Sequence, residues 1–431
     1  EKQVEAIVDS IGKEVLARMV AGTPLTVEEI QDRVEEGLIG FQQHKAVRNF
    51  ILYRTRHTAY REQLSRFAGH LPDAASPVGK ACLSVIRKLQ REEDETLYPA
   101  ELLLHKFESF RKAAMSEGDT VKSLARASLE LTSKESPRWE FIASAFLSIQ
   151  LRMDIERETM RLDIHGFEGK IRQLTREGLY GAYMLEHYSS ADIGQLEAML
   201  DGGRDGLLTY SSLDLLIKRY LIRDGDNRVL ETPQEMFMGI AMHLAIPEGG
   251  NRVYWAKRFY DMLSMLKVTM ATPTMSNARK PYHQLSSCFI DTVPDALDGI
   301  YRSIANFSQV SKFGGGMGLY FGKVRAVGSD IRGFKGAAGG VMRWIKLAND
   351  TAVAVDQLGV RQGAVAVYLD AWHRDLPEFL QMKTNNGDDR LKAHDVFPAI
   401  CYPDLFWRLA RDNMDATWHL MCPHEIEKAR G

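Results

Sequence analysis

From residue 286 onward, short β-prone runs alternate with longer helical runs, and this alternation constrains the fold more than any other feature of the chain. The β-prone runs are SSCFI, GLYFGKV, AVAVYLDA and FPAICY, and the helical runs include DALDGIYRSIANFSQV and VMRWIKLANDTAVAV. Strands that alternate with helices form βα units, because a parallel neighbour is reached only through a long crossover. The sequence therefore predicts an α/β sheet or barrel in this region.

The chain before residue 286 is predicted to be mostly helical. Apolar residues at positions 4, 7, 8 and 11 follow the spacing of an amphipathic helix. Thr26 is predicted to cap a second helix whose first turn carries Glu28 and Glu29. A third helix is expected at about 43–68, and further helices follow a linker at 71–79. Near position 232, the segment ETPQEMFMGIAMHLAI has a capping-box start and predicts a packed helix.

A basic cluster on the third helix has two interpretations. It consists of Arg54, Arg56, His57 and Arg61. Spacing alone favours a solvated basic face over a phosphate site.

Composition narrows the class of protein. The chain has 431 residues, enough for two or three domains, and its net charge of −2 gives no sign of nucleic-acid or membrane-surface binding. No apolar run approaches the roughly 18 residues of a membrane span, and no signal-peptide pattern occurs. Four cysteines without a zinc-type spacing fit a reducing cytoplasm. The chain starts at Glu1, inside a helical pattern, so it is expected to be a segment of a longer polypeptide.

The stretch between Ala271 and Arg361 concentrates the residues that can carry chemistry. Cys288 lies in SSCFI at the start of a predicted strand, where residue type alone favours a buried structural thiol over a redox group. Cys82 is likewise expected to be buried. The glycine cluster GGGMG at 314–318 matches neither a P-loop nor a dinucleotide fingerprint, so a tight turn is the default.

Three arginines near glycines raise the prospect of nucleotide binding. Arg325, Arg332 and Arg361 lie in loop-like sequence, and guanidinium groups suit phosphates, while Asp295 is available to a ribose hydroxyl. Thr272 and Ser287 supply hydroxyls near Cys288 in sequence, which suit either a sugar or a turn. Other polar residues are expected to be structural or to form caps and turns, without a metal-site spacing: His373, His394, Asp388 and Asp389.

The ordered set ATPTMSN, QLSSCFI, GGGMGLYFGKVRAVGSDIRG, QLGVRQGA, WHRDLPEFL and PHEI resembles the large (α) subunit of ribonucleotide reductase. The resemblance is close and in order over roughly 260–426. Residues 1–65 resemble the later part of that family's ATP-cone. The resemblance implies an α/β fold with a helical ATP-cone remnant (1–70), a helical linker domain (71–270) and the first half of a ten-stranded α/β barrel (271–431).

The resemblance also implies roles for individual residues. Cys288 resembles the first cysteine of the pair that reduces the ribose and forms a disulfide. The substrate-binding positions are Thr272, Ser287, Gly316 and Arg361. The positions for the specificity effector, a dNTP, are Asp295, Arg325, Arg332, Asp356 and Gln357. The helices at 295–312 and 342–353 resemble those that pair two α subunits.

The implied activity is reduction of ribonucleoside diphosphates by thiyl-radical chemistry, under ATP and dNTP control. The resemblance implies no directly bound metal or cofactor. The expected partners are a metal-containing, radical-generating small subunit, a second α subunit in a dimer or higher oligomer, and a thioredoxin- or glutaredoxin-type reductant. An adenosylcobalamin-dependent reductase and a non-catalytic nucleotide-binding fragment stay open as alternatives.

The chain departs from the family pattern in several places. No N-x-C-x-E motif for the radical cysteine occurs, and neither Cys401 nor Cys422 matches that cysteine or the partner of Cys288. A tyrosine-pair radical relay, a CxxC-type tail and the opening strands of the ATP-cone are also missing. The expectation is that this chain alone binds dNTP without reducing nucleotides.

Overall fold

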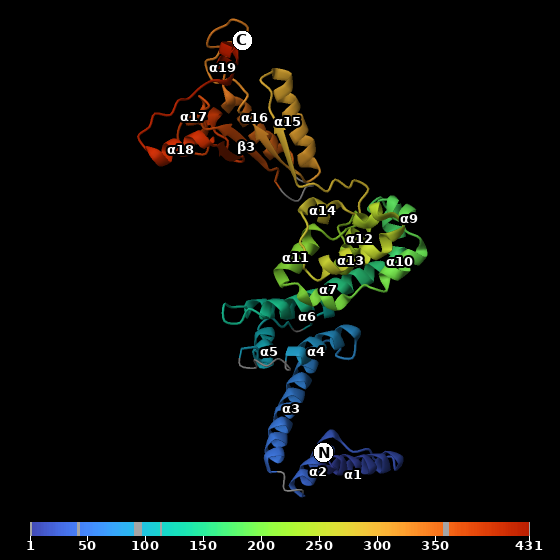
Figure 1. Ribbon diagram of the computed structural model, residues 1–431. Helices are drawn as coiled ribbons and strands as arrows, with labels where there is room; N and C mark the ends of the chain where they lie inside the picture. Colours follow the sequence, from blue (N-terminus) through green and yellow to red (C-terminus); the bar gives the residue numbers. More distant parts are fainter. Residues whose placement is uncertain (1, 41–43, 90–96, 113, 357–361, 431) are drawn as a thin grey trace. The chain divides into compact units, whose positions relative to one another are not determined.

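The computed structural model describes residues 2–40, 44–89, 97–112, 114–356 and 362–430 (Figure 1). The chain divides into two compact units. The first contains Glu1–Glu156 and Asp205–Asp214, and the second contains Arg157–Arg204 and Leu215–Gly431.

The first unit is helical. It contains α1 (Lys2–Val20), α2 (Val27–Gly40), α3 (His44–His70), α4 (Pro77–Leu89), α5 (Ala100–Glu108), α6 (Glu117–Glu130) and most of α7 (Trp139–Arg161). Its core is apolar and includes Phe67, Ile86, Phe107 and Trp139, all fully buried. Cys82 also lies in this core, as predicted, and burial raises the pKa of its thiol to about 12.

The predicted start of α2 is confirmed. The backbone N–H of Thr26 donates to Glu29 Oε2 at 2.6 Å, and the N–H of Glu29 donates back to Thr26 Oγ1 at 3.2 Å. The basic cluster of α3 faces the acids of α2: Arg54 pairs with Asp32 at 2.6 Å and Arg61 with Glu28. These two arginines therefore neutralise acidic side chains of the neighbouring helix α2.

The second unit begins with short helices. They are α8 (Gly166–Arg176), α9 (Tyr183–His187), α10 (Ser190–Glu197), α12 (Pro233–Ala245), η2 (Ile246–Asn251), α13 (Arg252–Ser264) and α14 (Thr272–Asn277). Two further helices, η1 (Gly202–Leu207) and α11 (Tyr210–Arg219), have residues in both units. The predicted capping box of α12 is present, with Thr232 Oγ1 accepting from the N–H of Glu235.

A buried ion pair joins several of these helices. The side chains of Glu231 and Arg279 are both 0% exposed and are hydrogen-bonded to each other. Glu231 also accepts from the hydroxyl of Tyr180 at 3.1 Å and from the N–H of Ile222 at 2.8 Å. Because each carboxylate oxygen has donors, the pair is both neutralised and hydrogen-bonded away from water.

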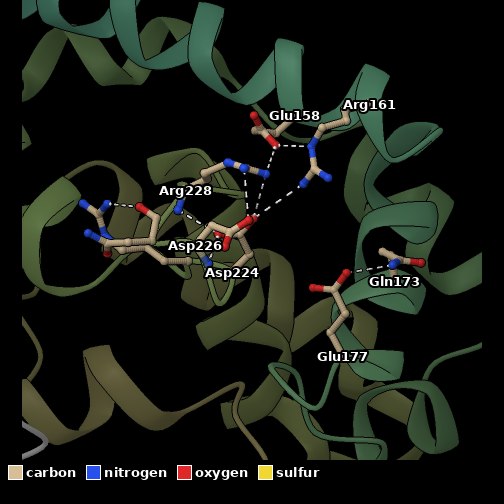
Figure 2. A network of polar contacts seen from close by, with 9 residues as sticks. Glu158, Arg161, Gln173, Glu177, Asp224, Asp226 and Arg228 are labelled. Atoms are coloured by element: carbon tan, nitrogen blue, oxygen red, sulfur yellow. Dashed lines mark hydrogen bonds and ion pairs between the residues drawn. The ribbon is translucent and has the colours of Figure 1, made fainter.

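A partly buried ion network anchors the turn that follows α11 (Figure 2). Glu158 accepts from Arg161 at 2.6 Å and from Arg228 at 3.3 Å. Arg228 also pairs with Asp226 at 3.0 Å, and Asp224 lies 3.6 Å from Arg161. The acids of this turn are thus matched by arginines at the end of α7 and within the turn itself.

The remainder of the second unit is built on a parallel sheet. Its strands are β1 (Cys288–Thr292), β2 (Gly316–Tyr320), β3 (Val365–Asp370) and β4 (Phe397–Cys401), in the order β1-β2-β3-β4. The other elements are α15 (Leu297–Lys312), α16 (Val341–Ala354), α17 (Leu376–Leu380), η3 (Asp389–Leu391), α18 (Asp404–Asp412) and α19 (Pro423–Arg430). Each of the four β-prone runs therefore overlaps a strand, although β2 ends at Tyr320, before the last four residues of GLYFGKV. The two main crossover helices are confirmed.

The sheet is buried on the side that α15 and α16 cover. Phe307 and Ile345 from these helices pack with Leu319 and Val367 from the central strands, and all four are fully buried. At β1, burial alternates, and Ile290 is 86% exposed. Because side chains alternate between the two faces of a strand, one face of β1 is open.

Candidate functional site

Cys288 is the first residue of β1, and its side chain is exposed. Its Sγ lies 3.4 Å from Oγ of Ser287. Across the sheet, Cys288 is in register with Gly316, whose N–H donates to the carbonyl of Ser287 at 2.7 Å. The expectation of a buried strand thiol, based on residue type, is wrong, because Cys288 begins an edge strand and points to its open face.

The glycine cluster brings β2 against β1. Gly314 has a φ of 88°, which favours glycine, and forms the predicted turn. At Gly315, an added Cβ would lie 2.7 Å from Val310 Cγ1 and 2.8 Å from Phe289 Cε2. Gly316 to Gly318 then belong to β2 rather than to the turn. The cluster therefore permits close strand packing directly beside Cys288.

The short helix α14 supports the segment that leads to Cys288. Thr274 Oγ1 donates to the carbonyl of Leu285 at 3.1 Å, and Asn277 Nδ2 donates to the carbonyl of Gln284 at 2.9 Å. Thr272 begins this helix, and its Oγ1 lies 3.2 Å from the hydroxyl of Tyr220. The hydroxyl of Thr272 and the thiol of Cys288 are thus carried by one hydrogen-bonded segment.

Asp295 and Arg325 form a second polar centre. Arg325 Nε donates to Asp295 Oδ2 at 2.8 Å, and the N–H of Arg325 donates to Oδ1 at 3.1 Å. Arg325 Nη1 also donates to the carbonyl of Asp330 at 2.6 Å. Asp295 follows β1 and Arg325 follows β2, so the pair lies at the carboxyl end of the sheet, where α/β folds bind ligands.

The thiol and this ion pair lie at opposite ends of β1. Cys288 begins the strand, and Asp295 comes three residues after its last residue, Thr292. Four residue steps of about 3.3 Å give a strand length of roughly 13 Å. The arrangement therefore separates a site with a thiol from a site with a carboxylate and a guanidinium.

Arg332 lies in the same loop as Arg325 but apart from the ion pair. It is exposed, with a φ of 50°, between the bridge partners Ile331 and Phe334. Asp356 is exposed after α16. Gln357 and Arg361 lie outside the described residues.

A buried carboxylate that the sequence reasoning missed fixes the stem of this loop. Asp375 is 2% exposed and accepts from the N–H of Val327 at 2.9 Å and of Val341 at 2.9 Å. His373, fully buried, lies with Nε2 2.8 Å from the carbonyl of Val324. The prediction of a structural His373 is confirmed. The segment WHRDLPEF therefore does more than begin α17. Its Asp375 joins the two ends of the loop 327–341 by accepting from Val327 and Val341.

Cys422 contacts the same loop from the start of α19. Its Sγ lies 3.1 Å from Oγ of Ser329 and accepts from the N–H of Ala326 at 3.4 Å. Arg374, just before α17, donates to Glu425 of α19 at 2.8 Å, so α19 is also held by the segment that precedes α17. This thiol is buried, and its contacts give it a structural role.

A further polar group lies at the carboxyl ends of the inner strands. The hydroxyl of Tyr320 donates to Asp370 Oδ2 at 2.5 Å, and Asp370 is in register with Cys401. Burial and the neighbouring Asp370 raise the pKa values of Tyr320 and Cys401. No sequence motif predicts this group, because Tyr320, Asp370 and Cys401 lie on three different strands and only the strand register brings them together.

The described ranges contain no group of three or more His, Cys, Asp or Glu side chains placed to hold a metal ion. Among the helices described, none is long and apolar enough to cross a membrane.

Three family models match separate stretches of the chain. Residues 1–59 match an ATP cone domain, 206–283 match the all-alpha domain of ribonucleotide reductase, and 286–431 match its barrel domain. The barrel match begins two residues before Cys288 and contains all four strands.

Curated relatives agree with these matches. The chain is 55% identical over 433 residues to the ribonucleoside-diphosphate reductase subunit alpha of Treponema pallidum (strain Nichols), covering 100% of this chain and 50% of the relative. It is 38% identical over 74% of its length to the protein of that name from Helicobacter pylori (strain ATCC 700392 / 26695), covering 39% of it. For Chlamydia muridarum (strain MoPn / Nigg), identity is 33% over 99% of this chain and 42% of the relative.

The chain spans half or less of the length of these relatives. Within that span, the two reductase domains and the ATP cone occur in the order that the sequence resemblance implied. The chain belongs to the ribonucleotide reductase large-subunit family.

Proposed function

We propose that this chain is the part of a ribonucleoside-diphosphate reductase that supplies one reducing thiol and the specificity-effector loops. The observation that carries the proposal is the exposed Cys288 at the start of β1, beside Ser287 and opposite Gly316. A thiol there is accessible to a substrate, and the surrounding backbone is fixed by α14.

In the proposed reaction, Cys288 acts as a reductant. A ribonucleotide loses its 2′ hydroxyl as water, and two thiols are oxidised to one disulfide, which balances the two electrons gained by the ribose. The radical that starts the reaction comes from a metal-containing small subunit. The second thiol and the radical cysteine belong to the reductase outside this chain. Ser287, Gly316, Thr272 and Arg361 are the proposed substrate contacts.

The pair Asp295 and Arg325 is the proposed centre of the effector site. Their ion pair fixes the guanidinium beside a carboxylate at the ends of β1 and β2. In the proposed complex, the carboxylate accepts from a ribose hydroxyl, and the guanidinium binds effector phosphates. Arg332, Asp356 and Gln357 are proposed to complete the site.

The proposed partner arrangement is a dimer of α subunits through α15 and α16. Tyr301 on α15 is 53% exposed and Val353 on α16 is 61% exposed, so both helices carry uncovered apolar side chains. The proposed domains are 1–70, 71–270 and 271–431. A thioredoxin- or glutaredoxin-type protein is the proposed source of electrons.

The relatives' name, a reductase subunit alpha, supports a separate radical-generating subunit over adenosylcobalamin. Two assays test the proposal. Thermal shift with dATP, dTTP and dGTP should show stabilisation of the chain, because a ligand that binds only the folded state raises its stability. The complete reductase carrying this segment should convert CDP to dCDP only with its small subunit. No thermal response and no turnover would together refute the proposal.

A further inference from the structure

A large cavity in the second unit lies outside the residues assigned to the thiol and effector sites. It has a volume of about 900 Å³, within the range of roughly 300–1,000 Å³ typical of small-molecule sites. Its walls come from the loop after α8, the end of α11 with the turn that follows, the segment 277–282 and the end of α15. Neither Cys288 nor the pair Asp295 and Arg325 lines it.

The charge of the cavity wall has one sign. Of its 14 lining residues, five are cationic and none is acidic: Lys218, Arg219, Arg223, Lys280 and Lys312. Like charges that share one cavity repel each other, and water screens this repulsion at the exposed Lys218, Arg219 and Lys312 more than at the half-buried Arg223 and Lys280. An anionic ligand would remove this cost.

Three of these cations have no carboxylate partner within salt-bridge distance in the described part of the chain: Arg219, Lys280 and Lys312. Arg223 donates to the carbonyls of Asn227 at 2.8 Å and Ile217 at 2.5 Å, which leaves its positive charge uncompensated. Burial and the adjacent Arg279 lower the pKa of Lys280. Its charged form would therefore be favoured by a bound anion.

Acids close to the wall are engaged by other groups, and Glu231, which accepts from the N–H of the lining residue Ile222, is paired with Arg279. Asp224 and Asp226 lie in the same turn as Arg223, but they pair with Arg161 and Arg228 (Figure 2). Because those arginines neutralise the two acids, the turn presents Arg223 and Asn227 to the cavity without a compensating carboxylate.

Two aromatic rings line the same cavity. Tyr282 is 76% exposed, and its ring centroid lies 6.3 Å from that of Phe313 with an interplanar angle of 37°. The backbone behind Tyr282 is fixed, since Tyr183 donates to the carbonyl of Lys280 at 3.1 Å. An exposed aromatic face beside a group of cations is the combination that stacks a base and binds its phosphates.

We propose that this cavity binds a nucleoside polyphosphate, with the phosphates on Arg219, Arg223 and Lys280 and the base against Tyr282 and Phe313. The cavity is separate from the effector site, because its lining residues include neither Asp295 nor Arg325 nor any residue of the loop 327–341. It is also separate from the ATP cone match at 1–59.

Photoaffinity labelling of the whole chain with an azido derivative of ATP tests the proposal, with adducts assigned to single residues by fragment-ion sequencing. The expected result is an adduct on Tyr282 or Phe313 that falls at least about tenfold in Arg219→Glu, because one cation is replaced by an acid. Arg325→Gln should leave this adduct unchanged. Arg176→Glu is the matched control, since Arg176 is exposed on α8 and does not line the cavity.

Competition with unlabelled tripolyphosphate tests the role of the rings. The expected competition is at least several-fold weaker than that of ATP, since tripolyphosphate cannot stack. Circular dichroism checks that Arg219→Glu is folded, and Arg219→Gln, with a smaller expected loss, replaces it if it is not. The absence of an adduct on both rings at millimolar ATP, an adduct insensitive to both Arg219 variants, or equal competition by tripolyphosphate would overturn the proposal.

Discussion

Asp295 holds Arg325 by two hydrogen bonds, one from the side chain at 2.8 Å and one from the backbone N–H at 3.1 Å. The carboxylate therefore sets both the position of the loop after β2 and the direction of the guanidinium. A phosphate ligand would find this arginine already oriented, which lowers the entropy cost of binding.

Asp295→Asn is expected to weaken dNTP binding about tenfold or more, because it removes the charge that orients Arg325 and a proposed acceptor for the ribose. Isothermal titration with dTTP measures the effect. The matched control is Asp412→Asn, which removes an acid from an exposed pair with Arg411. Unchanged affinity in Asp295→Asn would place the effector elsewhere.

Glu231→Gln is expected to destabilise the fold by about 3–5 kcal/mol, because it leaves the buried charge of Arg279 uncompensated. Urea denaturation measures the free energy of unfolding. Glu425→Gln is the control, because the side chains of Glu425 and its partner Arg374 are 47% and 40% exposed. An exposed pair of this kind contributes about 0–1 kcal/mol. Equal effects of the two variants would show that burial does not decide the cost.

The cysteines should differ in reactivity toward iodoacetamide in the native chain. Cys288 is exposed and is expected to react first, whereas Cys82 and Cys422 are buried and should react only after unfolding. The pKa of Cys82, raised to about 12 by burial, further suppresses its thiolate. Mass spectrometry of peptides from timed samples gives the order, and labelling of Cys82 before Cys288 would contradict the structure.

Acid should destabilise the second unit partly through His243. Burial, with a smaller effect of the adjacent His283, lowers the pKa of His243 to about 4 from an unfolded value of about 6.5. The unfolded chain then binds the proton more readily, so this contribution to stability is complete above about pH 6.5 and is lost as the pH falls to about 4.

His243→Gln should therefore lose less stability than the parent chain between pH 7 and pH 4.5, measured by urea denaturation at each pH. His105→Gln, at an exposed position on α5, is the control. The same acid dependence in His243→Gln and in the parent chain would refute this account of His243.

Local patterns predicted much of the fold. The four strands and the caps at Thr26 and Thr232 were readable because each depends on residues close in sequence. The roles of Asp375 and of the pair Tyr320 and Asp370 were not, because their partners lie 34 to 50 residues away. Such contacts depend on strand register and loop closure, which no short motif encodes.

The site was predictable to a similar extent. The resemblance suggested site roles for Cys288, Asp295 and Arg325, which stay predictions, and the structure pairs the last two directly. Residue type alone favoured a buried Cys288, because cysteine is among the most buried residue types, whereas its thiol is exposed. The cationic cavity beside Tyr282 was also missed, because its lining residues come from four separate segments.

The central claim is that Cys288 is a reductant, and a single-turnover experiment tests it most directly. The complete reductase carrying this segment is prereduced, freed of external reductant and mixed with its small subunit, effector and CDP. We expect stoichiometric dCDP and the simultaneous loss of two free thiols, one of them Cys288, with no product from Cys288→Ser and full product from Cys401→Ser. Undiminished dCDP formation by Cys288→Ser, or a Cys288 that stays alkylatable after turnover, would contradict the account.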